Sequence, residues 1–139
     1  MIIFCFFLIL MLPGFFQQIR RVRYDLADYG GGAKIKGKIE AVDYIYQDAG
    51  EEEFNVLVFT PPIYDYPYRY LLDWYGEKKY GYVPGKEKKG IFYLWIEPDP
   101  QKRWTYQGWL ETVIKTGKVL KEETLPSGFI IQKRYAEKE

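Results

Sequence analysis

The sequence predicts an α+β protein, in which an N-terminal transmembrane helix precedes a small three-layer-like α/β domain. Residues 1–19 contain no charged side chain. Two later stretches, 54–60 and 91–96, are almost wholly apolar, as in strands covered on both faces. The segments around them have the spacing of amphipathic helices. We therefore expect a membrane helix with flanking arginines over 1–23, a glycine-rich hinge over 24–32 and a soluble domain over 33–139.

Residues 1–19 are sufficient for a membrane-spanning helix, which needs roughly 17–25 residues. A cleaved signal peptide is the alternative, but it would have a basic start and small residues near its cleavage point. Three arginines follow the apolar run at once, and by the positive-inside rule they place the domain in the cytoplasm. The run also begins at Met1 without a hydrophilic lead-in, which is typical of the last membrane helix of a larger protein.

The first soluble elements are a helix and a strand. A helix is expected over 33–49, ended by Gly50, because five apolar residues recur at spacings of three and four. These are Ile35, Ile39, Val42, Ile45 and Ala49. Lysines, Lys38 among them, are expected on the other faces. A buried strand over 54–60 follows, and two prolines end it.

The later elements complete the order α-β-α-β-α-β-β. A second helix is expected over 68–80, with Leu71, Leu72, Trp74 and Tyr75 toward the core. The strand over 91–96 should pair parallel to the first through a right-handed crossover. A third helix over 104–115, with Trp109, Leu110, Val113 and Ile114 as its apolar side, should end at Gly117. A C-terminal hairpin of 118–125 and 129–135 then completes a mixed sheet.

Composition excludes several classes of function. The chain has no histidine and a single cysteine, Cys5, which excludes a Ser/His/Asp hydrolase, a zinc cluster and an internal disulfide. It also lacks a glycine-rich phosphate-binding loop. The three arginines give residues 1–23 a charge of +3, and 17 basic against 19 acidic residues give the remainder −2. We therefore expect no nucleic-acid partner, no metal and no cofactor.

Carboxylates are the remaining candidates for chemistry. Asp65 follows the first predicted strand, and Glu97 and Asp99 follow the second. The carboxyl ends of parallel strands share one edge of the sheet, where α/β proteins bind ligands. The three side chains could therefore serve a small carboxylate-dependent glycan-active enzyme. The favoured alternative makes Asp65 and Asp99 turn formers beside prolines and pairs Glu97 with a surface cation.

Aromatic residues are densest over 60–74, which holds four Tyr and one Trp. Sugar rings present flat C–H faces that pack on aromatic rings, while carboxylate and guanidinium groups bond their hydroxyls. Packing in the core or at a membrane interface, including contact with lipid headgroups, is the alternative and the favoured reading of these aromatics. The predicted contact residues are Tyr64, Asp65, Tyr66, Arg69, Trp74, Glu97, Asp99 and Trp104.

Three runs of the sequence prompt a family resemblance. They are KIEAVDYIYQDAGEEEFNVLVFTPPIYDYPYRYLLDWYGEKKYGYVP, GIFYLWIEPD and LPSGFIIQKR. Together they resemble the soluble C-terminal region, with the last membrane helix, of bacterial mannosyltransferase-like membrane glycosyltransferases that use polyprenyl-phosphate sugars. The resemblance covers most of residues 15–135. It carries over no catalytic residue, and it implies an extracytoplasmic accessory domain beside a polytopic glycosyltransferase, contrary to the positive-inside rule.

We therefore expect a single-pass membrane protein without catalysis of its own, whose domain contacts a saccharide or lipid-linked sugar through aromatic residues. Two alternatives stay open. One is the carboxylate-dependent enzyme, and the other is a structural partner of another membrane protein, with the aromatics as its interface.

Overall fold

The computed structural model describes residues 12–20, 22–23, 34–61, 64–99, 101–102 and 104–137. Its elements, in order, are α2 (Ile35–Ala49), β1 (Phe54–Phe59), α3 (Tyr66–Tyr70), the π-helical segment η1 (Leu71–Gly76), α4 (Glu77–Tyr80), β2 (Gly90–Ile96), α5 (Trp104–Trp109), the π-helical segment η2 (Leu110–Ile114), β3 (Lys118–Thr124) and β4 (Ile130–Ala136). This is an α+β fold, and the predicted order of the soluble elements is confirmed.

Much of the predicted membrane helix lies outside the described residues. Residues 12–20 and 22–23 are helical, whereas residues 1–11 and the predicted hinge over 24–32 are not among those described. Within the described stretches, no helix combines the length and the apolar character that crossing a membrane requires. The membrane helix therefore stays a prediction.

The four strands form one mixed sheet in the order β1-β2-β4-β3. β1 and β2 pair in parallel, from Phe54 opposite Ile91 to Phe59 opposite Ile96. β4 is antiparallel to both β2 and β3. The predicted parallel pair and C-terminal hairpin are thus confirmed. β3 is an exposed edge strand, and its register with β4 shifts between Val119 and Lys121, as at a β-bulge.

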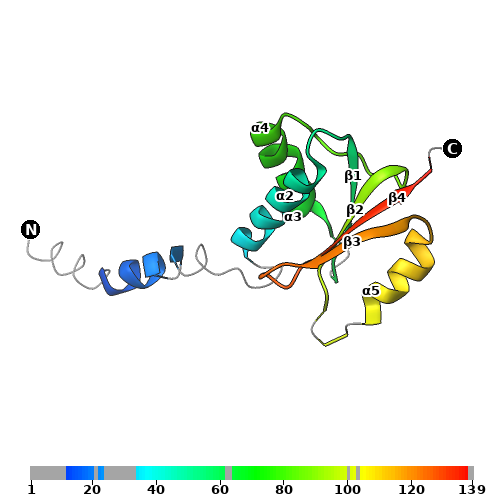
Figure 1. Cartoon of the computed structure of the whole chain (residues 1–139). Helices are drawn as coiled ribbons and strands as arrows, with labels where there is room; N and C mark the ends of the chain where they lie inside the picture. The colour runs from blue at the N-terminus through cyan, green and yellow to red at the C-terminus, as the bar shows by residue number, and fades with distance from the viewer. Residues whose placement is uncertain are drawn as a thin grey trace, which may run out of the picture.

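The sheet is the middle of three layers, because helices cover both of its faces (Figure 1). Alternate side chains of β2 separate into two cores: Tyr93 and Trp95 pack with α2, α3 and η1, while Phe92 and Leu94 pack with Ile114 of η2. Burial on both faces is why β1 and β2 are apolar without alternation. Each of these large side chains, wholly buried, contributes about 2–3 kcal/mol of hydrophobic stabilisation.

Asp48, in the last turn of α2, links this helix to three strands through hydrogen bonds and ion pairs. Its carboxylate accepts hydrogen bonds from Tyr93 Oη at 2.8 Å and from Lys121 Nζ at 2.6 Å, and it lies 3.2 Å from Lys133 Nζ. Burial alone would raise the pKa of Asp48. The hydrogen bonds from Lys121, Tyr93 and Lys133 outweigh burial and lower the pKa below its usual value.

Tyr46 links α2 to η1 and to the segment that follows α4. Its hydroxyl donates to Tyr82 O at 2.6 Å and lies 3.5 Å from Leu72 O in η1. The hydroxyl also fills the space beside Gly76, where an added Cβ would lie 2.3 Å from it. The close approach of α2 and η1 at this point therefore requires glycine.

Four details of the predicted helices were wrong. Lys38 is 9% exposed, because it lies four residues before Val42 and so shares the buried side of α2. Trp74 is 52% exposed, because it lies four residues after the exposed Tyr70 and shares its side of the helix, away from the buried Leu72. Val113 is 49% exposed. Lys115, at φ 56°, ends η2 before Gly117 is reached.

Candidate functional site

Polar side chains meet at the carboxyl ends of β1 and β2. The Glu97 N–H donates to Phe59 O at 2.8 Å, which continues the parallel pairing one residue beyond the strands. Glu97 Oε2 accepts hydrogen bonds from Thr60 Oγ1 at 3.0 Å and from the Tyr68 hydroxyl of α3. The Glu97 carboxylate is therefore held by two hydroxyl donors on the side of the sheet that α2 and α3 cover.

Lys38 brings a cation to this cluster from α2. Its Nζ lies 5.2 Å from the centre of the Tyr68 ring. Burial lowers the pKa of Lys38, and the charge of Glu97 opposes that decrease. Lys38 and Thr60 were absent from the predicted contact residues. The spacing of Lys38 from Val42 and the position of Thr60 directly after β1 were the signals that could have identified them.

Arg69 is placed inside the fold rather than on a ligand-facing surface. Its side chain is 8% exposed, its Nη2 donates to Val56 O, and its Nε lies 3.7 Å from Asp65 Oδ2. Burial lowers the pKa of Arg69, while the charges of Asp65 and Asp73 oppose this. The Val56 N–H donates to Gly85 O at 2.9 Å. Arg69 and Gly85 thus supply hydrogen-bond partners to the carbonyl and the N–H of Val56, on the outer edge of β1.

The two aspartates of the predicted cleft have local partners. Asp99 Oδ1 accepts the N–H groups of Gln101 at 2.8 Å and Lys102 at 3.3 Å, which is the hydrogen bonding of a turn-forming aspartate. Asp65 precedes α3, and its carbonyl accepts the N–H groups of Tyr68 and Arg69, each at 3.0 Å. The side-chain hydrogen bonds of Asp99 favour its turn-forming interpretation, whereas the carboxylate of Asp65 makes no capping hydrogen bond and faces Arg69.

Exposed aromatic rings line the outer side of α3 and η1. We call Tyr64, Tyr66, Tyr70 and Trp74 the aromatic stripe; their side chains are 68%, 73%, 60% and 52% exposed. Tyr64 and Tyr66 lie with ring centres 6.3 Å apart and planes within 16° of parallel. Tyr70 and Trp74 form a second pair, at 5.8 Å and 12°. The stripe therefore presents two pairs of nearly parallel rings.

The stripe follows from spacing along the helix. Tyr66, Tyr70 and Trp74 are separated by four residues each, so they lie on one side, while Tyr68, Leu71 and Leu72 on the other side are buried. Lys78 continues the row, with its Nζ 5.8 Å from the Trp74 ring centre. Tyr70 was not among the predicted contact residues, although its spacing from Tyr66 and Trp74 was visible in the sequence.

The structure divides the predicted contact residues among several places. Tyr64, Tyr66 and Trp74 share the aromatic stripe, Glu97 lies in the polar cluster, and Asp65 accompanies Arg69. Trp104 is 67% exposed, but it begins α5, which covers the other face of the sheet from α3 (Figure 1). Trp104 therefore belongs to a different layer from the stripe.

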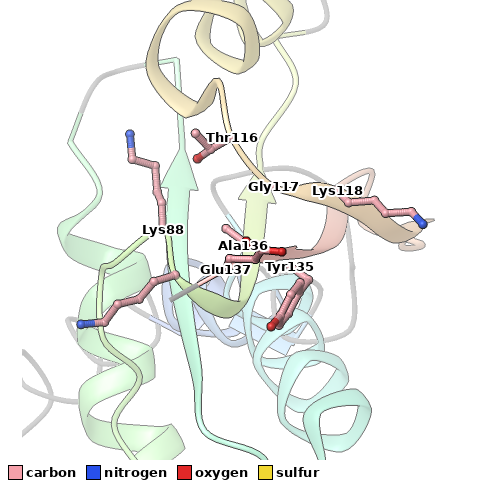
Figure 2. A pocket seen from close by; sticks show the side chains of 8 residues that line it. Lys88, Thr116, Gly117, Lys118, Tyr135, Ala136 and Glu137 are labelled. Carbon is pink, nitrogen blue, oxygen red and sulfur yellow. The ribbon is translucent and has the colours of Figure 1, made fainter. Parts of the chain in front are cut away.

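A basic pocket lies at the other end of the strands from Glu97, where β2 and β3 begin and β4 ends (Figure 2). It is lined by Lys88, Lys89, Thr116, Gly117, Lys118, Tyr135, Ala136 and Glu137. Lys88 Nζ donates to Val113 O at 2.8 Å, and Lys89 pairs with Glu87. Figure 2 shows Lys118 and Tyr135 pointing in different directions. The side chains therefore do not converge on one ligand.

Comparison of the chain with protein-family models, curated proteins and solved structures gave no match. Among the residues that the structure describes, no group of three or more His, Cys, Asp or Glu side chains is arranged to hold a metal ion. The aromatic stripe and the Glu97 cluster are thus the two groupings of side chains that bear on function.

Proposed function

We propose that the chain is a membrane-attached accessory domain, without catalysis of its own, that contacts saccharide through the aromatic stripe. The observation that carries the proposal is the stripe itself: four aromatic side chains, each more than half exposed, in two nearly parallel pairs, three of them on the α3–η1 segment and Tyr64 directly before it. Contiguous apolar surface of this kind marks binding sites in soluble domains.

The chemistry of the stripe suits a sugar. Ring centres 5.8 and 6.3 Å apart are too far separated for full face-to-face contact, so open ring surface remains for the C–H faces of a pyranose. Two acidic residues are sequence neighbours of the rings, Asp65 between Tyr64 and Tyr66 and Asp73 before Trp74, and their carboxylates can accept hydrogen bonds from hydroxyl groups. Asp65 has a 40% exposed side chain, and Asp73 is exposed. The stripe thus combines stacking surface with hydrogen-bond acceptors.

Membrane attachment is the second part of the proposal. It is supported by the charge-free residues 1–19 and by the resemblance to the soluble tail of membrane glycosyltransferases. In this proposal the domain lies on the extracytoplasmic side and assembles with a polytopic glycosyltransferase. Protease access to the exposed loop 86–89, in intact cells and in inverted vesicles, tests the side of the membrane.

A titration of the full chain tests saccharide contact. The chain is held in a detergent without sugar headgroups, saccharides are added, and binding is followed by tryptophan fluorescence and calorimetry. We expect Trp74→Ala to weaken binding about fivefold, because one aromatic contact is worth about 1 kcal/mol. Trp104→Ala is the matched control, since Trp104 is also exposed, at 67%, but in another layer, and it should leave the affinity unchanged. Equal loss in both variants, or no saccharide binding at all, would refute the proposal.

Lipid headgroups are the competing partner for the same rings, since Tyr and Trp also favour membrane interfaces. The two partners are distinguished by reconstituting the chain in vesicles that contain brominated lipids. A saccharide-binding stripe leaves Trp74 fluorescence unquenched by these lipids. Strong quenching that Trp74→Phe abolishes would instead assign the stripe to the bilayer surface.

A further inference from the structure

We infer that the aromatic stripe binds a linear, uncharged oligosaccharide that lies along the helix and spans several sugar units. This inference rests on the proposed saccharide function and specifies its ligand. Three features carry it: the length of the stripe, the reduced winding that η1 gives it, and the charges around it.

The stripe is longer than one sugar ring. Tyr66 and Trp74 are eight residues apart, which corresponds to about 12 Å along a helix axis. Tyr64 extends the row by a further ring, stacked on Tyr66. A single hexose could cover only one of the two ring pairs. A ligand that uses both pairs therefore has several sugar units.

The π-helical segment limits how far the row winds round the helix. Four residues of an α-helix advance by a full turn and about 40° more, so rings four apart wind gradually round the helix. A π-turn, with its i→i+5 hydrogen bonds, is wider, and four residues fall short of a full turn. The step from Tyr66 to Tyr70 is α-helical, and the step to Trp74 runs into η1. The two deviations oppose each other, so the row winds round the helix less than it would on an α-helix throughout, which suits a linear chain.

The charges around the stripe favour an uncharged ligand. Asp65 and Asp73 are sequence neighbours of the rings, the buried Arg69 offsets part of their charge from inside the fold, and Lys78 stands over Trp74 at one end. No basic cluster accompanies the described rings. The lysines gather instead at the opposite edge of the sheet, where Lys88, Lys89 and Lys118 line the pocket of Figure 2. An acidic polysaccharide would meet carboxylates at the stripe.

Calorimetry with ligands of increasing length tests the inference. The probes are linear glucose, mannose and N-acetylglucosamine series, from monosaccharide to hexasaccharide, with polygalacturonate as the acidic chain. The full chain is used in a detergent without sugar headgroups. We expect at least a tenfold rise in affinity from monosaccharide to trisaccharide in one neutral series. Tyr66→Ala and Trp74→Ala should each reduce that rise about fivefold. Tyr135→Ala is the matched control, because Tyr135 is 47% exposed at the distant edge, and should not change it.

The outcomes separate the inference from the proposed function. Equal affinity for monosaccharide and hexasaccharide, still lost in Trp74→Ala, would overturn the inference and leave saccharide binding at the stripe intact. Binding of polygalacturonate alone would overturn the uncharged ligand. Absence of binding in every series would overturn both. Circular dichroism of each variant establishes that it is folded, which these exposed positions permit.

Discussion

Removing the carboxylate of Asp48 should loosen α2 from the sheet. The side chain is 15% exposed and receives Tyr93 Oη, Lys121 Nζ and Lys133 Nζ from three strands. In Asp48→Ala these donors lose their shared acceptor. In Asp48→Asn an oxygen remains for the Tyr93 hydroxyl, but the negative charge between the two lysines is lost.

The magnitude follows from the burial of each donor. Tyr93 is fully buried, so leaving its hydroxyl without an acceptor costs about 1–3 kcal/mol. The side chain of Lys133 is 17% exposed, and losing its charged partner adds about 1 kcal/mol. Lys121 is half-exposed and adds little to this. We therefore expect Asp48→Ala to lower the free energy of unfolding by about 3 kcal/mol, and Asp48→Asn by about half as much.

Urea unfolding of the full chain in micelles, followed by near-ultraviolet circular dichroism, measures these losses. The folded-state pKa of Asp48 lies below the unfolded value of about 3.9. Its contribution is therefore fully present above about pH 4 and is lost as the pH falls through the folded pKa. The difference between wild type and Asp48→Asn should be constant from pH 7 to pH 5 and shrink below pH 4.

The matched control is Lys121→Ala, which removes the exposed donor alone and should change stability little. The reasoning would be refuted if Asp48→Ala unfolded within about 0.5 kcal/mol of wild type, the scatter of ordinary surface substitutions. A difference that grew as the pH fell from 5 to 3 would refute the assignment of a lowered pKa.

Two other substitutions test the packing. Gly76→Ala should lower the free energy of unfolding in urea by about 2 kcal/mol, because its Cβ would lie 2.3 Å from the buried Tyr46 hydroxyl. Gly108→Ala in α5 is the control: its Cβ meets nothing within 4 Å, so it should be neutral or slightly stabilising. Equal effects of the two substitutions would contradict the close approach of α2 and η1. Arg69→Ala should also lower the free energy of unfolding by about 2 kcal/mol, since it leaves Val56 O without its donor. Saccharide affinity should stay unchanged. A loss of affinity with unaltered stability would instead place Arg69 at the ligand.

Much of the fold could be predicted because β1 and β2 are apolar on both faces and the glycine at 50 and the turn at 126–128 separate the elements. The predicted position of Lys38 was wrong because a charged side chain was expected on an exposed face, although its spacing places it on the buried one. Lys38 lies four residues before Val42, on the buried side of α2, and its charge is placed beside Glu97 and Tyr68. Spacing alone would have located it.

The candidate site was harder to predict, because sequence shows which residues are aromatic or charged but not which share a layer. Trp74 and Trp104 are both exposed, yet they belong to helices on opposite faces of the sheet. The four-residue spacing of Trp74 from Tyr70 was visible in the sequence, whereas a pattern analysis based on 3.6 residues per turn does not anticipate the π-helical hydrogen bonding of η1. Arg69 has the residue type of a ligand contact, whereas its role at the edge of β1 depends on tertiary packing.

The two edge strands of the sheet, β1 and β3, have features that oppose aggregation. An open strand edge is a template on which another chain can add a strand. At β1 the outward groups of Val56 already bond Gly85 and Arg69, so an incoming strand finds its partners occupied. At β3 the register shift after Val119 interrupts the regular row of donors and acceptors, and lysine and glutamate side chains flank it. Both edges thus disfavour pairing with another chain: at β1 the backbone groups of Val56 already have partners, and at β3 the hydrogen-bonding pattern is interrupted by the register shift.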